Sequence, residues 1–171
     1  LNRLGIKTTL IAGPSNLVLP KDLDVKKITS ADEMLNEVKK SLPVDLAICA
    51  AAVADYKPAE KSKNKIKKEN RNLKFINLIK NNDILEYIAK NNKHRPRLVA
   101  GFSAETENLI KNSINKIKSK HCDFIIANDV SQKDIGFNSE YNKVSIIDKK
   151  GKIKTIPKNK KSFIANKIAE I

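Results

Sequence analysis

Residues 44–53 restrict the fold more than any other stretch, because their sequence VDLAICAAAV is apolar almost without interruption. A strand with one face in water alternates apolar and polar side chains, whereas a strand covered on both faces has no such period. Strands of the second kind belong to parallel sheets that carry helices on both sides. The stretch therefore predicts the central strand of an α/β protein.

The rest of the chain alternates between strand-like and helix-like patterns. Further strands are predicted at residues 7–13, 24–29, 73–79, 98–102 and 124–127, and helices at residues 30–42, 84–91, 104–120 and 160–171. Residues 143–156 predict a hairpin that turns at DKKG, and residues 54–72 predict a long loop. We therefore expect a single domain over residues 1–171, with a Rossmann-like, doubly wound and mainly parallel sheet that has a β-hairpin at its edge.

The charge of the chain leaves a binding function open beside an enzymatic one. Lys and Arg number 34 against 19 Asp and Glu, which gives a formal net charge of +15. Such an excess suits a nucleic acid partner, although lysine is also an ordinary solvated surface residue. Aromatic residues make up only 5% of the chain, and no helix-turn-helix or RNA-binding signature is present. A basic nucleic-acid-binding α/β domain remains the main alternative to an enzyme.

Several familiar motifs are missing from the chain. It contains no GxGxxG, GxxxxGK[ST], HExxH or CxxC sequence, so an NAD-dependent oxidoreductase of the same fold class lacks its fingerprint. No apolar stretch approaches the roughly 20 residues of a membrane helix. Cys49 and Cys122 lie far apart without metal-ligand spacing, which favours a reduced, cytoplasmic protein. No set of metal ligands is identified.

Ligands of open parallel sheets bind at the carboxyl ends of the strands. The predicted ends lie at residues 13–15, 51–55, 101–103 and 127–129, and three of these four combine small residues with a polar group. Asp55 follows the apolar strand and would suit a ribose, a base or a metal ion, but aspartate is equally common in turns. Small residues such as Cys49, Ala50 and Ala51 would let a ligand approach the backbone, or would simply contact helices.

A lysine-rich segment, KSKNKIKK, follows at residues 61–68. In an extended conformation Lys61, Lys63, Lys65 and Lys67 would point to one side and Ile66 to the other. A polyphosphate is a natural partner for such a row, and a solvated charge run is the competing interpretation.

A second pair of lysines is predicted on a helix. Lys116 and Lys120 are four residues apart, so they would lie on one flank of the helix at residues 104–120. Lysines on a helix flank often serve solubility alone, and the spacing does not decide between this role and ligand binding.

Seven segments occur in order within residues 7–147: AGPSNL, AAVADYKPAE, KIKK, NNDIL, GFSAETENL, IIANDVS and GFNSEYNKVSII. With these segments the chain resembles the ligase domain of the bacterial phosphopantothenate-cysteine ligase family, the synthetase half of bifunctional coenzyme A biosynthesis proteins. The chain departs from the family where Asn82 replaces the usual proline of NPDIL. The family's opening strand and Gly-rich loop would precede Leu1, so we expect residues 1–171 to lack them.

The resemblance implies a ligase that joins 4'-phosphopantothenate to cysteine, using CTP and Mg2+, through an acyl-cytidylate intermediate. It implies Lys65, the first lysine of KIKK, as the catalytic residue that neutralises phosphate charge. The implied nucleotide contacts are Cys49, Ala50, Ala51, Asp55, Lys65, Asn81, Asn82, Asp83, Ile84, Phe102, Lys116 and Lys120.

The resemblance also implies partners and limits. A homodimer is expected, and so is fusion to a flavin-dependent decarboxylase in the full protein. No nucleic acid and no membrane partner is expected. Without the opening strand and Gly-rich loop, we expect residues 1–171 to bind CTP without completing the reaction.

Overall fold

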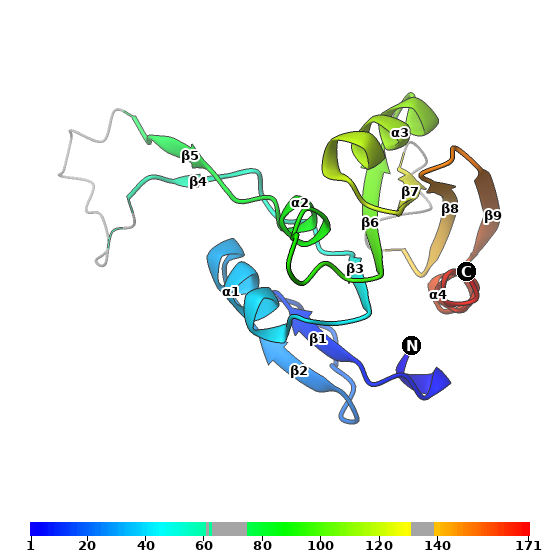
Figure 1. Cartoon of the computed structure of the whole chain (residues 1–171), viewed down its shortest axis with the longest axis horizontal. Helices are drawn as coiled ribbons and strands as arrows, with labels where there is room; N and C mark the ends of the chain where they lie inside the picture. The colour runs from blue at the N-terminus through cyan, green and yellow to red at the C-terminus, as the bar shows by residue number, and fades with distance from the viewer. Residues whose placement is uncertain (61, 63–74, 131–138) are drawn as a thin grey trace.

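The computed structural model describes residues 1–60, 62, 75–130 and 139–171 (Figure 1). The elements, in chain order, are η1 (Asn2–Leu4), β1 (Thr9–Ala12), β2 (Asp24–Lys27), α1 (Ala31–Ser41), β3 (Leu46–Cys49), β4 (Tyr56–Pro58), β5 (Leu78–Lys80), α2 (Ile84–Ala89), β6 (Leu98–Glu105), α3 (Leu109–Lys120), β7 (Phe124–Asp129), β8 (Tyr141–Asp148), β9 (Ile153–Lys160) and α4 (Lys161–Ala169).

The main sheet has five strands in the order β3-β6-β7-β8-β9. Strands β3, β6 and β7 run parallel, while β8 and β9 form an antiparallel hairpin that closes one edge. Strands β1 and β2 form a separate parallel pair. The predicted α/β fold, with parallel strands and a β-hairpin at the sheet edge, is confirmed.

The prediction of a central strand at residues 44–53 is wrong in position and length. Strand β3 covers only Leu46–Cys49 and lies at an edge of the five-stranded sheet. Its Ile48 is 37% exposed, and Ala50 to Ala52 beyond it are exposed. The centre is β7, where Ile125 and Ile126 are 0% and 1% exposed. An apolar run shows that a strand lacks polar side chains, but it does not give the position of that strand in the sheet.

The predicted helix at residues 104–120 is too long at its start. Strand β6 continues to Glu105, because Ser103, Ala104 and Glu105 pair in register with the last three residues of β7. Helix α3 begins only at Leu109. Glu105 is therefore a strand residue at the carboxyl edge of the sheet.

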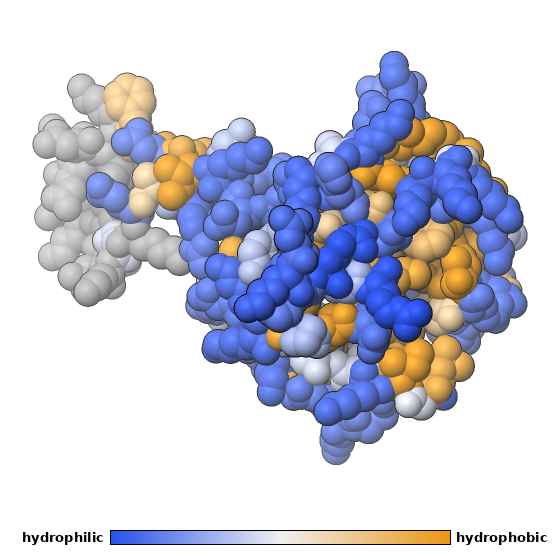
Figure 2. Space-filling view, viewed as in Figure 1, coloured by the Kyte–Doolittle hydropathy of each residue, from blue (hydrophilic) through white to orange (hydrophobic). Residues whose placement is uncertain are grey.

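The predicted loop at residues 54–72 contains a strand in its described part. Strand β4 pairs antiparallel with β5, and Figure 1 shows the two strands as an arm that projects from the body. Tyr56 and Leu78 on the arm are each 59% exposed, and Figure 2 shows apolar surface on the arm among hydrophilic residues.

Helix α1 begins within the sequence SADE at residues 30–33, which has the Ser-x-x-Glu pattern of a helix start. Ser30 is the N-cap, and its hydroxyl accepts a hydrogen bond from Glu33 N at 3.3 Å. The Glu33 carboxylate accepts from Thr29 N at 2.7 Å, one residue earlier than in a standard capping box. The predicted helix start is confirmed.

Apolar side chains cover both faces of the main sheet. One cluster packs α1, α2 and α3 against the sheet and includes Val99, Ile125 and Ile147. The other packs α4 against the opposite face and includes Ile126 and Ile164. Helices therefore cover both faces, as a doubly wound sheet requires.

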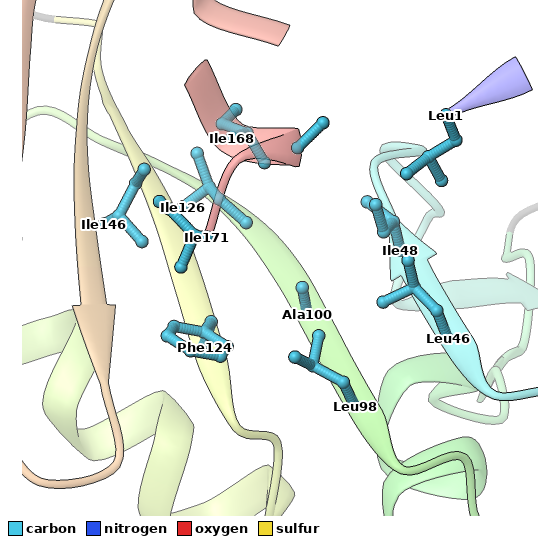
Figure 3. A pocket seen from close by; sticks show the side chains of 11 residues that line it. Leu1, Leu46, Ile48, Leu98, Ala100, Phe124, Ile126, Ile146, Ile168 and Ile171 are labelled. Carbon is cyan, nitrogen blue, oxygen red and sulfur yellow. The ribbon is translucent and has the colours of Figure 1, made fainter. Parts of the chain in front are cut away.

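Beside α4, part of the second face stays open. Figure 3 shows a hollow whose floor is formed by side chains of β3, β6 and β7, among them Ile48, Ala100 and Ile126. Its lining is almost wholly apolar. In the described ranges, no helix has both the length and the apolar composition needed to cross a membrane.

Candidate nucleotide site at the carboxyl edge of the sheet

Two motifs that are far apart in the sequence meet just beyond β3. Asn81 N donates to the Asp55 carbonyl at 2.7 Å, and Asn81 Nδ2 donates to the Ala54 carbonyl at 2.8 Å. Asn81 is only 8% exposed, and its Oδ1 has no hydrogen-bond partner among the described residues. The NNDIL segment is therefore fixed to the strand-end segment that carries Asp55, and a buried acceptor lies at the junction.

The same segment begins helix α2. Asp83 is the N-cap, and its Oδ1 accepts from Glu86 N at 2.8 Å. Its other oxygen, Oδ2, lies 2.8 Å from Lys120 Nζ on α3. Asn82, which replaces the family's proline, is exposed, and the helix still begins at Ile84. The departure at Asn82 therefore leaves the start of α2 intact.

Both predicted helix lysines contact carboxylates from neighbouring elements. Lys116 Nζ donates to Glu105 Oε1 at 2.7 Å, and Lys120 Nζ donates to Glu86 Oε2 at 3.1 Å. The hydrogen bond from Lys120 to Asp83 raises the pKa of the Lys120 ammonium. Both lysines therefore take part in ion pairs on the side of the sheet that α2 and α3 cover.

The predicted contacts are divided between the two faces of the sheet. Cys49 packs in the cluster under α1, α2 and α3. The next residue, Ala50, lines a second hollow beside α4, which is separate from the hollow of Figure 3. Phe102 lines the same hollow and packs against the α4 cluster. The Phe102 side chain thus lies across the sheet from Lys116 and Lys120. A ligand that contacts all of these residues has to lie over the strand ends.

The remaining predicted nucleotide contacts are Ala51, Asp55, Ile84 and Lys65. Ala51 and Asp55 are exposed beyond the carboxyl end of β3, and Ile84 is buried at the start of α2. Lys65, the predicted catalytic residue, lies outside the described residues. Its role stays a prediction.

The structure adds polar residues that the sequence reasoning did not select. Glu105 is held at both carboxylate oxygens, because Asn112 Nδ2 donates to its Oε2 at 3.0 Å. Glu86 lies between Lys90 and Lys120. Its place in the segment GFSAETENL could have identified Glu105 as a site residue, but the sequence pattern was interpreted as placing this residue in a helix.

The cysteines at and near the site are poor nucleophiles. Both Cys49 and Cys122 are free. Burial, followed by the charge of Asp83, raises the pKa of the Cys49 thiol to about 11, and burial raises that of Cys122 to about 11. The thiols therefore stay protonated near neutral pH.

Fold and site together define a Rossmann-type α/β domain in which two predicted ligand-binding segments, around Asp55 and Asn81, meet beyond the end of β3. Residues 1–171 match the family model of the DNA/pantothenate metabolism flavoprotein C-terminal domain, and the chain belongs to this family.

Curated relatives carry the name coenzyme A biosynthesis bifunctional protein CoaBC. The protein from Borreliella burgdorferi is 42% identical over 171 residues, which are 99% of this chain and 42% of the relative. That from Haemophilus influenzae is 38% identical over 168 residues, 98% of this chain and 41% of the relative. The chain thus spans about two fifths of the length of these relatives.

Solved structures agree with the sequence relatives. The crystal structure of the C-terminal domain of a CoaBC protein superposes with a TM-score of 0.79 at 28% identity, over 99% of this chain and 74% of that one. The DNA/pantothenate metabolism flavoprotein from Streptococcus pneumoniae gives a TM-score of 0.77 at 20% identity, over 99% of this chain and 82% of that one, and supports the fold.

The Glu86 carboxylate provides a direct test of the ion pairs at α2. Hydrogen bonds from Lys90 and Lys120 lower its pKa to about 2. We expect the Lys120→Met variant to raise the pKa of Glu86 towards its ordinary value, with the side-chain carboxyl followed by NMR during an acid titration. Lys118→Met, on the same helix, is the control and should leave the Glu86 titration unchanged. Equal titrations in the wild type and in Lys120→Met would contradict the ion pair.

Proposed function

We propose that the chain is the ligase domain that joins 4'-phosphopantothenate to cysteine in coenzyme A biosynthesis, with CTP as the activating nucleotide. Family membership supports this proposal. The observation that carries it is the pair of hydrogen bonds from Asn81 to Ala54 and Asp55, because they unite two predicted nucleotide-binding motifs at one edge of the sheet. This edge is where open α/β sheets bind their ligands.

The reaction has two steps. The carboxylate of 4'-phosphopantothenate attacks the α-phosphorus of CTP, which forms an acyl-cytidylate and releases pyrophosphate. The amine of cysteine then attacks the acyl carbon, forms the amide and releases CMP. Lys65 is proposed to neutralise charge that develops on the phosphates during the first step, as fixed cations do in phosphoryl transfer. The strand-end residues around Ala51 position the nucleotide.

A magnesium ion is part of this proposal. Mg2+ in nucleotide enzymes is held by one or two carboxylates together with substrate phosphates. Asp55 fits this requirement, because its side chain is exposed at the strand end, whereas Asp83 is already engaged by Lys120. Among the described residues no cluster of three or more metal-ligating side chains exists, so the phosphates would supply the remaining oxygens. The ion would neutralise part of the triphosphate charge.

We further propose that residues 1–171 form one ligase domain, and the family model that matches all of these residues supports this. Strands β1 and β3 are not paired with each other in the described chain, and each has an unpaired edge. A parallel strand between them would join the two parallel sheets.

The proposal includes partners and a compartment. We propose fusion to a flavin-dependent decarboxylase in the full protein, in keeping with the bifunctional names of the relatives. We also propose a homodimer. We also place the protein in the cytoplasm, which the free thiols of Cys49 and Cys122 support.

Calorimetric titration with CTP and Mg2+ tests the proposal, with ATP as the competitor. The wild-type chain should bind CTP saturably and in preference to ATP. The Lys65→Gln variant should bind CTP at least about tenfold more weakly, since it loses one charged contact to phosphate. Lys154→Gln, on the hairpin, is the matched control for a lost surface charge and should bind normally. Salt-sensitive binding without preference between CTP and ATP would instead support a nucleic-acid-binding domain.

A further inference from the structure

Two lysines of α3, Lys116 and Lys120, lie in a group of ion pairs whose charges balance. Lys116 pairs with Glu105 at 2.7 Å, and Lys120 pairs with Asp83 at 2.8 Å. Glu86 contacts both Lys120, at 3.1 Å, and Lys90, at 2.6 Å. The three lysines in this cluster, Lys90, Lys116 and Lys120, therefore meet three carboxylates, those of Asp83, Glu86 and Glu105.

This balance makes Lys116 a poor site for a phosphate. A phosphate bound to the Lys116 ammonium would also lie within a few ångströms of the Glu105 carboxylate, and like charges repel strongly at that separation. The ammonium has already lost water to a charged partner, so its net attraction for a further anion is reduced. The lysine segment at residues 61–68 contains no carboxylate within its sequence, and Glu60 and Glu69 lie only at its two ends.

The same pair is well suited to a hydroxyl group. An ammonium offers three donors, and a carboxylate offers about four acceptor positions. Lys116 and Glu105 each use only part of this capacity in their mutual contact. A hydroxyl accepts one hydrogen bond and donates another, so a sugar with two adjacent hydroxyls can satisfy both members of the pair at once.

Glu105 is held in a fixed position at the carboxyl edge of the sheet. Its side chain is 13% exposed, it ends strand β6, and Asn112 Nδ2 fixes its second oxygen at 3.0 Å. Burial alone would raise the pKa of Glu105, but the hydrogen bonds from Lys116 and Asn112 outweigh it and lower the pKa. The carboxylate is therefore charged, oriented and placed where a nucleotide would lie over the strand ends.

We propose that the Lys116–Glu105 pair recognises the ribose hydroxyls of the nucleotide, and that the phosphates bind elsewhere in the site. This inference rests on the proposed function. Glu105 becomes a specificity-determining residue, and Asn112 becomes a positioning residue that orients it.

Binding of three ligands to matched variants tests the proposal. The ligands are CTP, 2',3'-dideoxy-CTP and inorganic tripolyphosphate, each titrated calorimetrically with Mg2+. Lys116→Met and Glu105→Gln should each weaken CTP binding about tenfold, the loss expected for one hydrogen bond to a charged group. Both variants should bind dideoxy-CTP and tripolyphosphate as the wild type does. Lys118→Met on the same helix should bind all three ligands normally.

The outcomes separate the inference from the proposed function. If Lys116→Met weakens tripolyphosphate binding as much as CTP binding, the pair contacts phosphate and the inference is wrong. If Glu105→Gln tightens CTP binding, the carboxylate only opposes phosphate, and the inference is again wrong. If the wild type shows no saturable binding of CTP, the proposed function is wrong, and the inference that rests on it is wrong with it. Equal weakening of CTP and dideoxy-CTP by both variants also overturns the ribose assignment, while CTP binding itself still stands.

Rescue by a conservative variant excludes a purely structural effect. Lys116→Arg keeps the charge and the donors towards Glu105, so it should retain most of the preference for CTP over dideoxy-CTP. Loss of that preference in Lys116→Arg, with an unchanged unfolding free energy, would contradict recognition of the hydroxyls through this pair.

Discussion

Replacing Asp123 with Ala is expected to lower the free energy of unfolding by about 3 kcal/mol. The Asp123 side chain is 10% exposed and accepts three hydrogen bonds. The donors are Val99 N and Arg95 Nη2, both at 2.9 Å, and Lys149 Nζ at 3.0 Å. Removing the carboxylate leaves the buried Val99 N–H without its acceptor and the Arg95 guanidinium without its charged partner. A buried polar group without a partner costs more free energy than the loss of the hydrogen bond alone.

Chemical denaturation of the Asp123→Ala variant measures this loss. Asp24→Ala is the control, because Asp24 pairs with Lys26 at 2.9 Å while both side chains are about half exposed. Exposed ion pairs of this kind contribute little to the free energy of unfolding, so this free energy should be nearly the same in the control variant and in the wild type. Equal stability of the two variants would show that the network around Asp123 is not needed.

The same carboxylate gives the stability a pH dependence. Burial would raise the pKa of Asp123, but hydrogen bonds from Val99 N, Lys149 and Arg95 outweigh it and lower the pKa below the usual value. A carboxyl with a lowered folded pKa stabilises the fold above its unfolded pKa of about 3.9, and this contribution disappears as the pH falls through the folded pKa. The difference between wild type and Asp123→Ala should therefore shrink in acid.

Replacing Gly101 with Ala is expected to destabilise the fold by about 2 kcal/mol. A Cβ at this position would lie 2.5 Å from Leu85 Cδ2 and 3.1 Å from Ile125 Cδ1. Leu85 belongs to α2 and has to shift, while Ile125 is fully buried at the centre of the sheet. Thermal or chemical unfolding measures the effect.

Gly13→Ala is the matched control for Gly101→Ala. Its Cβ would meet only Ile28 Cδ1, at an ordinary contact distance of 3.8 Å. Its effect should therefore stay within about 0.5 kcal/mol. Since Gly101 lies under α2, its replacement should also weaken CTP binding through a displaced Asp83. Normal stability of Gly101→Ala would mean that Leu85 moves away without loss of packing.

Local sequence signals predicted the order of most elements and the hairpin, because caps, turns and periodicity act over a few residues. They failed where the extent of a strand depends on pairing with a strand that is distant in the sequence. Strand β6 extends to Glu105 because β7 pairs with it, and β4 exists because β5 lies opposite. Apolar composition also could not distinguish β3 at the sheet edge from β7 at the centre.

The candidate site was also predictable from the sequence only in part. The rule that ligands bind at strand ends selected the segment around Asp55, and the family resemblance selected Asn81. These two segments meet in the fold. It could not predict that Phe102 and Lys116 lie on opposite faces, because this depends on which residues of β6 face α3. The partnership of Lys116 with Glu105 was hidden by the incorrect helix start.

The two edges of the five-stranded sheet differ in their protection against unwanted strand addition. Strand β9 carries Lys154, Lys158 and Pro157, and charges and proline on an edge discourage a neighbouring chain from pairing. Strand β3, with the sequence LAIC, has neither a charge nor a proline. At high protein concentration, aggregation of this chain should therefore begin at β3, and a lysine introduced at Ile48 should improve its solubility.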